Sequence, residues 1–228
     1  MKKSLLAVVA AILTASVLPA HAQVRITEVV PWSSSSAVGA DWFELTNTGA
    51  VALDITGWTM DDDSNNPNSA LLSGITSIAP GESVIFLELA GGGNATTLTN
   101  LFISTWFGGS APAGLHIGTY TQGVAGGVGL GAGGDAVNVF NGTAGTLQAK
   151  VTFGASDSVN PLQTFDNAAG LNNTTISQLS VVGTNGAFVA ANDVNQIGSP
   201  GAIPEPQTYA MMLVGLTLLV ALTRKRRA

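Results

Sequence analysis

Residues 41–58 decide the fold, and their sequence is DWFELTNTGAVALDITGW. Two runs that alternate apolar with polar residues flank a turn-forming segment, Asn47-Thr48-Gly49. Such alternation is typical of strands that bury one face, and Asn and Gly supply a tight connection. On the second run, Val51, Leu53 and Ile55 share one face. We therefore predict a β-hairpin here and an all-β fold.

Further strands are predicted where the sequence alternates or is rich in β-branched residues. They are residues 24–30, 83–89, 135–140 and 146–153, with weaker candidates at residues 176–182 and 187–190. In the first, we expect Val24, Ile26 and Val29 to face inward. An Asn141-Gly142 step between two of these runs predicts a second hairpin.

A glycine-rich segment at residues 90–133 interrupts the strand pattern. Within it, four apolar residues recur at helical spacing: Leu98, Leu101, Phe102 and Trp106. Asn94 precedes them as an N-cap candidate, so we predict a short helix at residues 94–107.

Many short strands separated by turn signals indicate an antiparallel sandwich or barrel. The glycine motifs have no fixed period, which argues against a solenoid. The chain has no cysteine, so core packing must hold the fold without disulfides. The body at residues 23–201 is long enough for one sizeable core.

The N-terminus has the three parts of a secretory signal peptide. A positive start at residues 1–3 precedes an apolar run at residues 5–18, and Ala20-His21-Ala22 fits the small-x-small cleavage rule. We predict cleavage after Ala22, which removes residues 1–22. A permanent N-terminal anchor is the weaker alternative, because the run is short for a spanning helix.

The body is strongly acidic once the two ends are set aside. The whole chain has a formal net charge of −6, but Arg25 and Lys150 are the only basic residues between positions 23 and 201. Thirteen of the fourteen acids lie in the same stretch. Such a body repels phosphate backbones, which argues against nucleic acid as a partner, and it attracts divalent cations.

The C-terminus, residues 202–228, carries a second address. Pro204, Glu205 and Pro206 precede an apolar run at residues 208–223, and a cluster of four basic residues follows. As a helix this run would be about 24 Å long, slightly short of a hydrocarbon core of about 30 Å. The basic cluster favours the cytoplasmic side. We therefore expect export of the body first and transient anchoring of residues 208–223 in the inner membrane.

Five segments of the body resemble successive landmarks of the lamin-tail domain. They are residues 26–29 (ITEV), 41–47 (DWFELTN), 55–58 (ITGW), 79–83 (APGES) and 134–137 (GDAV). The resemblance covers most of residues 23–201 and implies an immunoglobulin-like antiparallel β-sandwich, a domain that also occurs in bacterial exported proteins. The departure is an insert at about residues 90–133, which would decorate one end of the sandwich or carry a binding surface.

The order Pro-Glu-Pro, apolar span and basic end resembles the PEP-CTERM sorting signal. In that family an exosortase in the inner membrane of Gram-negative bacteria processes the tail and releases the protein to the surface or extracellular matrix. The resemblance implies loss of the residues after about Pro206, with the export machinery and exosortase as partners. An ordinary single-span anchor is the alternative.

Candidate catalytic residues in the body are few. His116 is its one histidine, and without cysteine there is no Cys–His pair. No Gly-x-Ser-x-Gly elbow supports a Ser-His-Asp triad, so we interpret His116 as a loop residue. Glu28 and Glu44 lie on predicted strands, and paired carboxylates are the remaining basis for glycoside hydrolysis. Both match landmarks of a domain that is not known for catalysis.

Two weaker binding candidates remain. Asp61, Asp63 and Asn65 alternate as calcium-loop ligands do, but the EF-hand glycine and glutamate are absent, so the alternatives are a loose surface calcium site and a solvated turn. Trp32 and Trp106, beside loops, are candidates for stacking on carbohydrate, although core packing is the favoured interpretation.

The leading hypothesis is an exported, non-catalytic protein of the cell surface or exopolysaccharide matrix. It would bind exopolysaccharide or other surface proteins, or act structurally, with no cofactor other than the calcium candidate. The alternatives are a secreted hydrolase acting on polysaccharide and a periplasmic binding domain that stays anchored in the inner membrane.

Overall fold

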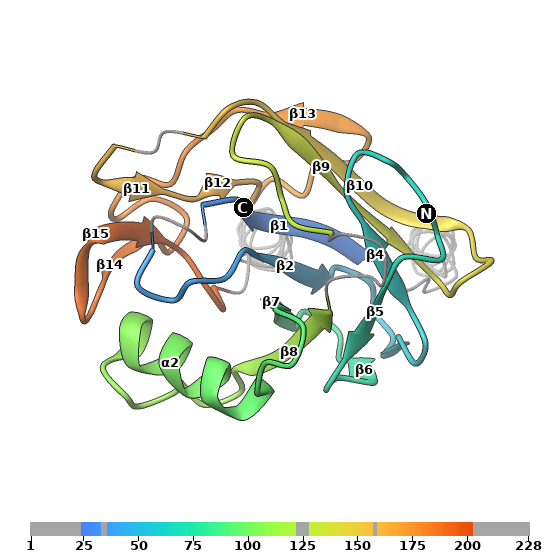
Figure 1. Cartoon of the computed structure of the whole chain (residues 1–228), viewed down its shortest axis with the longest axis horizontal. Coiled ribbons are helices and arrows are strands. Elements are labelled where there is room, and N and C mark those ends of the chain that lie inside the picture. Colours follow the sequence, from blue (N-terminus) through green and yellow to red (C-terminus); the bar gives the residue numbers. More distant parts are fainter. Residues whose placement is uncertain (1–23, 33–35, 122–127, 157–158, 203–228) are drawn as a thin grey trace, which may run out of the picture.

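The computed structural model describes residues 24–32, 36–121, 128–156 and 159–202 (Figure 1). Several predictions concern residues outside these ranges, namely cleavage after Ala22, the Pro204-Glu205-Pro206 motif and the span at residues 208–223. Among the described residues, no helix combines the length and the apolar character needed to cross a membrane.

Ten strands form one continuous sheet, in the order β12-β1-β2-β7-β8-β5-β4-β9-β10-β13. Their bounds are β1 Val24–Val30, β2 Trp42–Asn47, β4 Thr59–Asp61, β5 Ala70–Ser73, β7 Ser83–Leu89, β8 His116–Thr121, β9 Asp135–Phe140, β10 Leu147–Phe153, β12 Phe165–Asp166 and β13 Thr174–Ile176.

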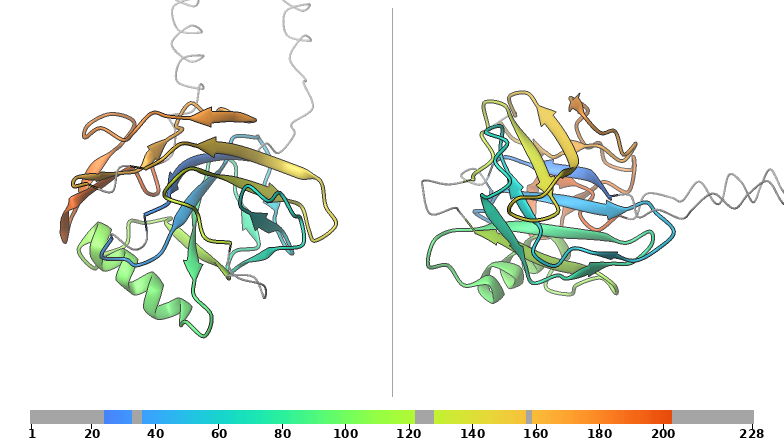
Figure 2. Two further views of the ribbon diagram at one scale, coloured as in Figure 1. Left: turned by 45° about the horizontal axis from the view of Figure 1, so that its top comes forward. Right: turned by 90° about the vertical axis from the view of Figure 1, so that its right-hand side faces the viewer.

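The sheet folds over on itself into two layers (Figure 2). Strand β5 is the fold line, because it pairs with β8 in one layer and with β4 in the other. Apolar side chains of both layers meet in one core, among them Ile26 of β1, Phe86 of β7 and Val151 of β10. The all-β, immunoglobulin-like antiparallel sandwich predicted from the sequence is confirmed, with parallel pairing at β7–β8 and β10–β13.

Most of the predicted strands are confirmed. Strand β1 has the predicted bounds, and Val24, Ile26 and Val29 face the core. Strands β9 and β10 pair antiparallel and form the predicted second hairpin. The strand predicted at residues 176–182 is wrong, because β13 ends where that prediction begins and pairs with β10 through residues 174–176.

The hairpin predicted at residues 41–58 does not form. Strand β2 pairs with β1 and β7, whereas the second run supplies β3 (Leu53–Asp54), which pairs with β6 (Ser77–Ile78). The side chain of Asn47 redirects the chain between them. Its Nδ2 donates to Val51 O at 2.8 Å and to Ile78 O at 2.9 Å, so Asn47 ties the turn to β6 instead of closing a two-stranded ladder.

The first half of the insert is part of the sandwich. Residues 90–115 connect the parallel neighbours β7 and β8, a connection that needs a long crossover, and α2 (Ala95–Phe107) supplies it. Asn94 Oδ1 accepts from Thr97 N at 2.9 Å, which confirms the predicted N-cap and helix. Leu101 departs from the predicted apolar face, since it is 42% exposed. Strand β8 is an internal strand of the sheet, so this part of the insert is no decoration.

A second apolar cluster covers the outer face of β1, β2 and β7. Helix α2 lies on this face together with a three-stranded sheet of β11 (Leu162–Gln163), β15 (Asp193–Gly198) and β14 (Phe188–Ala190) (Figure 1). The indole of Trp42 meets Phe102 and Trp106 edge to face, with ring centroids 5.5 and 5.9 Å apart. Strand β2 is therefore buried on both of its faces.

Candidate functional site

Two glutamates lie opposite each other on the covered outer face of the sheet. Glu28 of β1 and Glu44 of β2 are register partners, and a β-bulge inserts Thr27 between this pair and the inward-facing pair of Ile26 and Leu45. The extra residue lets Thr27 and Glu28 both leave the core side. Glu28 is 0% and Glu44 2% exposed, although both are carboxylic acids.

The C-terminal strap, residues 199–202, covers these two side chains. The backbone N–H of Ser199 donates to Glu28 Oε1 at 2.7 Å, and that of Gly201 donates to Glu44 Oε2 at 2.6 Å. Ser83 Oγ donates to the carbonyl of Ala202 at 3.3 Å. The strap is thus held by side chains of three adjacent strands, β1, β2 and β7.

A Pro-Gly turn gives the strap its shape. Ala202 N donates to Ser199 O at 2.9 Å, and Gly201 has a φ of 74°. Pro at the second position and a left-handed Gly at the third are the requirements of a type II turn. The same chemistry forms the turn before β7, where Glu82 N donates to Ala79 O at 3.0 Å and Gly81 has a φ of 76°.

Buried hydroxyl groups also donate to both carboxyls. Thr27 Oγ1 donates to Glu44 Oε1 at 2.7 Å, and a chain continues from it through Thr46 to Ser83 with steps of 2.8 and 2.6 Å. On the other side, Thr164 Oγ1 donates to Glu28 Oε1. Within the described residues, Glu28 Oε2 has no hydrogen-bond partner.

Burial shifts the ionisation of both acids strongly. Loss of water and, to a smaller extent, the charge of Glu44 raise the pKa of Glu28 to about 8, although the bonds from Ser199 and Thr164 oppose the rise. Burial also raises the pKa of Glu44 to about 7 against the bonds from Thr27, Gly201 and Ser83. Near neutral pH the two acids therefore hold a proton between them, because two adjacent buried charges are unfavourable.

The two carboxyls bind backbone amides of the strap. In each carboxyl, one oxygen accepts a hydrogen bond from a backbone N–H of the strap, and the strap covers Glu28 and Glu44. A glycoside hydrolase needs its two carboxyls to flank a sugar and a water in an accessible site. The described contacts of Glu28 and Glu44 are those of a clamp on the chain's own C-terminal segment.

The two tryptophans proposed to stack on carbohydrate do not form an exposed platform. Trp32 is 2% and Trp106 1% exposed. Trp106, in the last turn of α2, packs against Trp42 and Phe188, and Trp32 Nε1 donates to Gln163 O at 3.3 Å. The stacking hypothesis is wrong for both, and core packing, the favoured interpretation, is confirmed, because both rings belong to the second apolar cluster.

In the acidic loop after β4, the side chain of Asp61 accepts hydrogen bonds from later residues of the loop. Asp61 Oδ2 accepts from Ser64 Oγ at 2.7 Å and from Asn66 N at 2.5 Å. Asp63 contributes its backbone N–H to Asp135 Oδ1 at 3.0 Å, and Asn65 adopts a positive φ of 56°. Among the described residues, no three His, Asp or Glu side chains gather in a way that could hold a metal. Calcium binding by Asp61, Asp63 and Asn65 stays a prediction.

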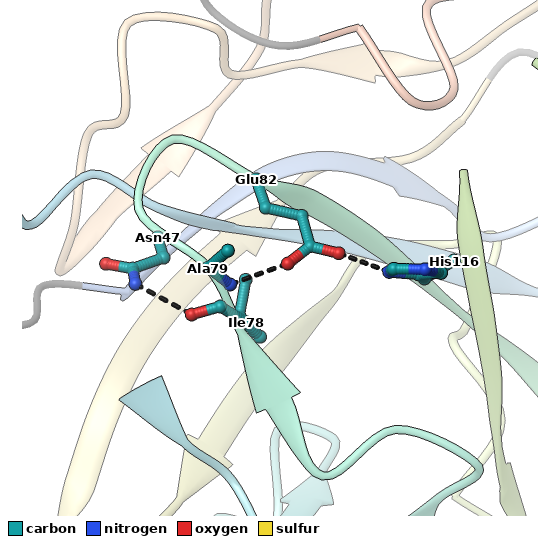
Figure 3. Close-up of polar contacts among 5 residues, drawn as sticks. All are labelled: Asn47, Ile78, Ala79, Glu82 and His116. Atoms are coloured by element: carbon teal, nitrogen blue, oxygen red, sulfur yellow. Dashed lines mark hydrogen bonds and ion pairs between the residues drawn. The ribbon is translucent and has the colours of Figure 1, made fainter. Parts of the chain in front are cut away.

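His116 is not in a loop, because it is the first residue of β8. Its Nδ1 contacts Glu82 Oε1, while Glu82 Oε2 accepts from Ala79 N at 2.6 Å (Figure 3). The His116 side chain is 61% exposed, so this ion pair lies at the surface. It links the start of β8 to the Pro-Gly turn before β7.

The strap itself was not anticipated from the sequence. The strongest available signal was the Ser199-Pro200-Gly201-Ala202 turn, which is separated by one residue from the Pro-Glu-Pro tripeptide. Nothing local to that turn indicates that its two amides meet carboxyls more than 150 residues earlier in the chain.

Comparison with known families identifies two parts of the chain. The family model Lamin Tail Domain matches residues 18–155, and the PEP-CTERM protein-sorting motif matches residues 202–227. The first match spans β1 to β10, and the second begins at Ala202, the last residue of the strap. No curated protein and no solved structure matches the chain.

Proposed function

The chain belongs to the lamin tail domain family, and from this membership and its sorting motif we propose that it is a non-catalytic binding or structural protein of the cell surface or extracellular matrix. The PEP-CTERM motif makes it an exported protein that exosortase sorts. We propose further that the tail anchors the chain in the inner membrane only transiently, and that exopolysaccharide or other surface proteins are its partners.

The observation that carries the non-catalytic proposal is the burial of Glu28 and Glu44 beneath the strap. These two strand carboxylates are the pair that a glycoside hydrolase would need for catalysis. Their hydrogen bonds go to the strap backbone and to buried hydroxyls, so the pair supports the scaffold. The acidic body disfavours polyanionic partners, and a neutral or cationic polymer suits it better.

An assay with the producer's own exopolysaccharide separates this proposal from hydrolysis. The purified protein is expected to cosediment with the polymer and to release no new reducing ends. Glu28→Gln and Glu44→Gln should bind the polymer as the wild type does. Reducing ends that the wild type releases and both variants fail to release would overturn the proposal in favour of a hydrolase.

Fractionation of the producer with intact mass measurement tests the sorting. We expect surface or extracellular protein that begins near Gln23 and lacks the residues after about Pro206. Protein found only in the inner membrane with residues 224–228 attached would instead establish the permanently anchored alternative.

A further inference from the structure

We propose that the strap is a latch for the sorting motif, and that tail processing takes place from molecules in which the strap has left Glu28, Glu44 and Ser83. This rests on the proposed processing of the tail. Glu28, Glu44 and Ser83 are then positioning residues, since they act on the motif through the strap.

The sorting motif begins close in sequence to the last docked residue. Ala202 is held by Ser83, and Pro204 is two residues further along the chain. Two residues span at most about 7 Å, which limits the length of the tether between the docked strap and the motif. An enzyme that binds the motif as an extended segment then meets the β-sandwich itself.

Release of the strap removes this constraint without unfolding the sandwich. Gly198 ends β15, which pairs with β14 through Phe188 and with β11 through neighbouring residues. Undocking residues 199–202 therefore adds four residues of free chain, with a reach of about 14 Å. The strap is a single four-residue turn held by the side chains of Glu28, Glu44 and Ser83, so it can open locally while the strands that precede it stay paired.

Glycine makes the docked position possible and offers a selective variant. A Cβ on Gly201 would lie 2.7 Å from Leu115 Cδ1, at a φ of 74° that disfavours other residues. Gly201→Ala therefore weakens docking and leaves both carboxyls in place. Gly81→Ala is the matched control, because Gly81 has the same role and φ in the other Pro-Gly turn and a Cβ there meets nothing within 4 Å.

The experiment follows the full-length precursor in the producing cells by pulse-chase. Gly201→Ala is expected to speed conversion to the processed form roughly 5–30-fold, the range for a local equilibrium shifted by the loss of one contact. Gly81→Ala should process at the wild-type rate. Eight Gly-Ser residues inserted after Ala202 should also accelerate processing, because they lengthen the tether while the strap stays docked.

Each outcome decides the proposal. Equal rates for wild type, Gly201→Ala and the insertion would overturn the latch while leaving exosortase sorting intact. A slower Gly201→Ala together with an unchanged insertion would also overturn it. A wild-type chain that keeps residues 224–228 would overturn the proposed processing as well, so the two failures are distinguishable. The insertion leaves the sandwich untouched and keeps the test valid if Gly201→Ala fails to fold.

Discussion

Both faces of strand β2 are buried, and after Trp42, which joins the second apolar cluster, they differ in chemistry. Phe43 and Leu45 point into the main core, where the ring of Phe43 stacks on Phe86 at 5.7 Å. Glu44 and Thr46 point the other way, into a layer of carboxyls and hydroxyls closed by the strap. The apolar face can be covered by any apolar neighbour of suitable shape. The polar face needs donors at defined positions, and these come from distant parts of the chain.

Removal of a large inner side chain should have the largest effect. Phe43→Ala is expected to lower the free energy of unfolding by about 3–5 kcal/mol, because Phe43 is fully buried against Phe86 and Tyr120 and the cavity cannot refill. Urea denaturation measures the change. Leu71→Ala, at an exposed position of β5, should change it by less than about 0.5 kcal/mol. Similar losses for both variants would contradict the description of the core.

The two buried acids on the outer face of the sheet should make the free energy of unfolding depend on pH. Its titrating groups are Glu28 and Glu44, with pKa values raised to about 8 and about 7, and Asp166 of β12 faces Glu28. The folded state binds more protons than the unfolded state above about pH 4.5. Stability is therefore fully present at low pH and is lost as pH rises towards 8, by an amount on the order of a few kcal/mol.

Melting temperatures at pH 5, 7 and 9 test this sign. They should fall across the series, and Glu28→Gln should flatten the decline, because glutamine mimics the protonated acid. A melting temperature that rises from pH 5 to pH 9 in the wild type would show that the two acids are held as charges instead.

Loss of one link in the hydroxyl chain should have a smaller effect. Thr46→Val removes the group between Thr27 and Ser83 and leaves both without that partner, at a cost of about 1–2 kcal/mol. Thr46→Ser keeps the hydroxyl and serves as the control. Denaturation curves should place the serine variant nearer the wild type; the reverse order would mean that the Thr46 methyl group, and not its hydroxyl, matters.

The surface ion pair should contribute least. His116→Ala removes the contact to Glu82, yet the histidine is 61% exposed, so the expected change is less than about 0.5 kcal/mol. Thermal melting at low and high salt measures it. A loss above 1 kcal/mol would show that the link between β8 and the Pro-Gly turn matters to the fold.

Elements with their own local signals could be predicted from sequence. Strand β1 is a β-branched run, and α2 has a polar cap and a Gly108 terminus, so both are specified by neighbouring residues. The prediction of a hairpin at residues 41–58 is wrong for a different reason. Alternation predicts that a segment is a strand but does not choose its partner, and here Asn47 joins its turn to β6.

The candidate site could be predicted only in part. Glu28 and Glu44 were recognised as strand carboxylates, but their burial depends on Ser199 and Gly201, which reach them through the packing of β15. The sequence favoured core packing for Trp106, which is confirmed, but it did not identify Trp42 and Phe188 as the residues that Trp106 packs against.

The sequence by itself determined the C-terminal sorting motif, the all-β class and the segments that become β1, β7, β9, β10 and α2. Those properties depend on composition, periodicity and caps, which act over a few residues. Only the tertiary structure decided that β2 is buried on both faces, that β8 joins the sheet and that the strap covers Glu28 and Glu44. Those outcomes depend on contacts between distant segments, and local preferences carry no information about which segments meet.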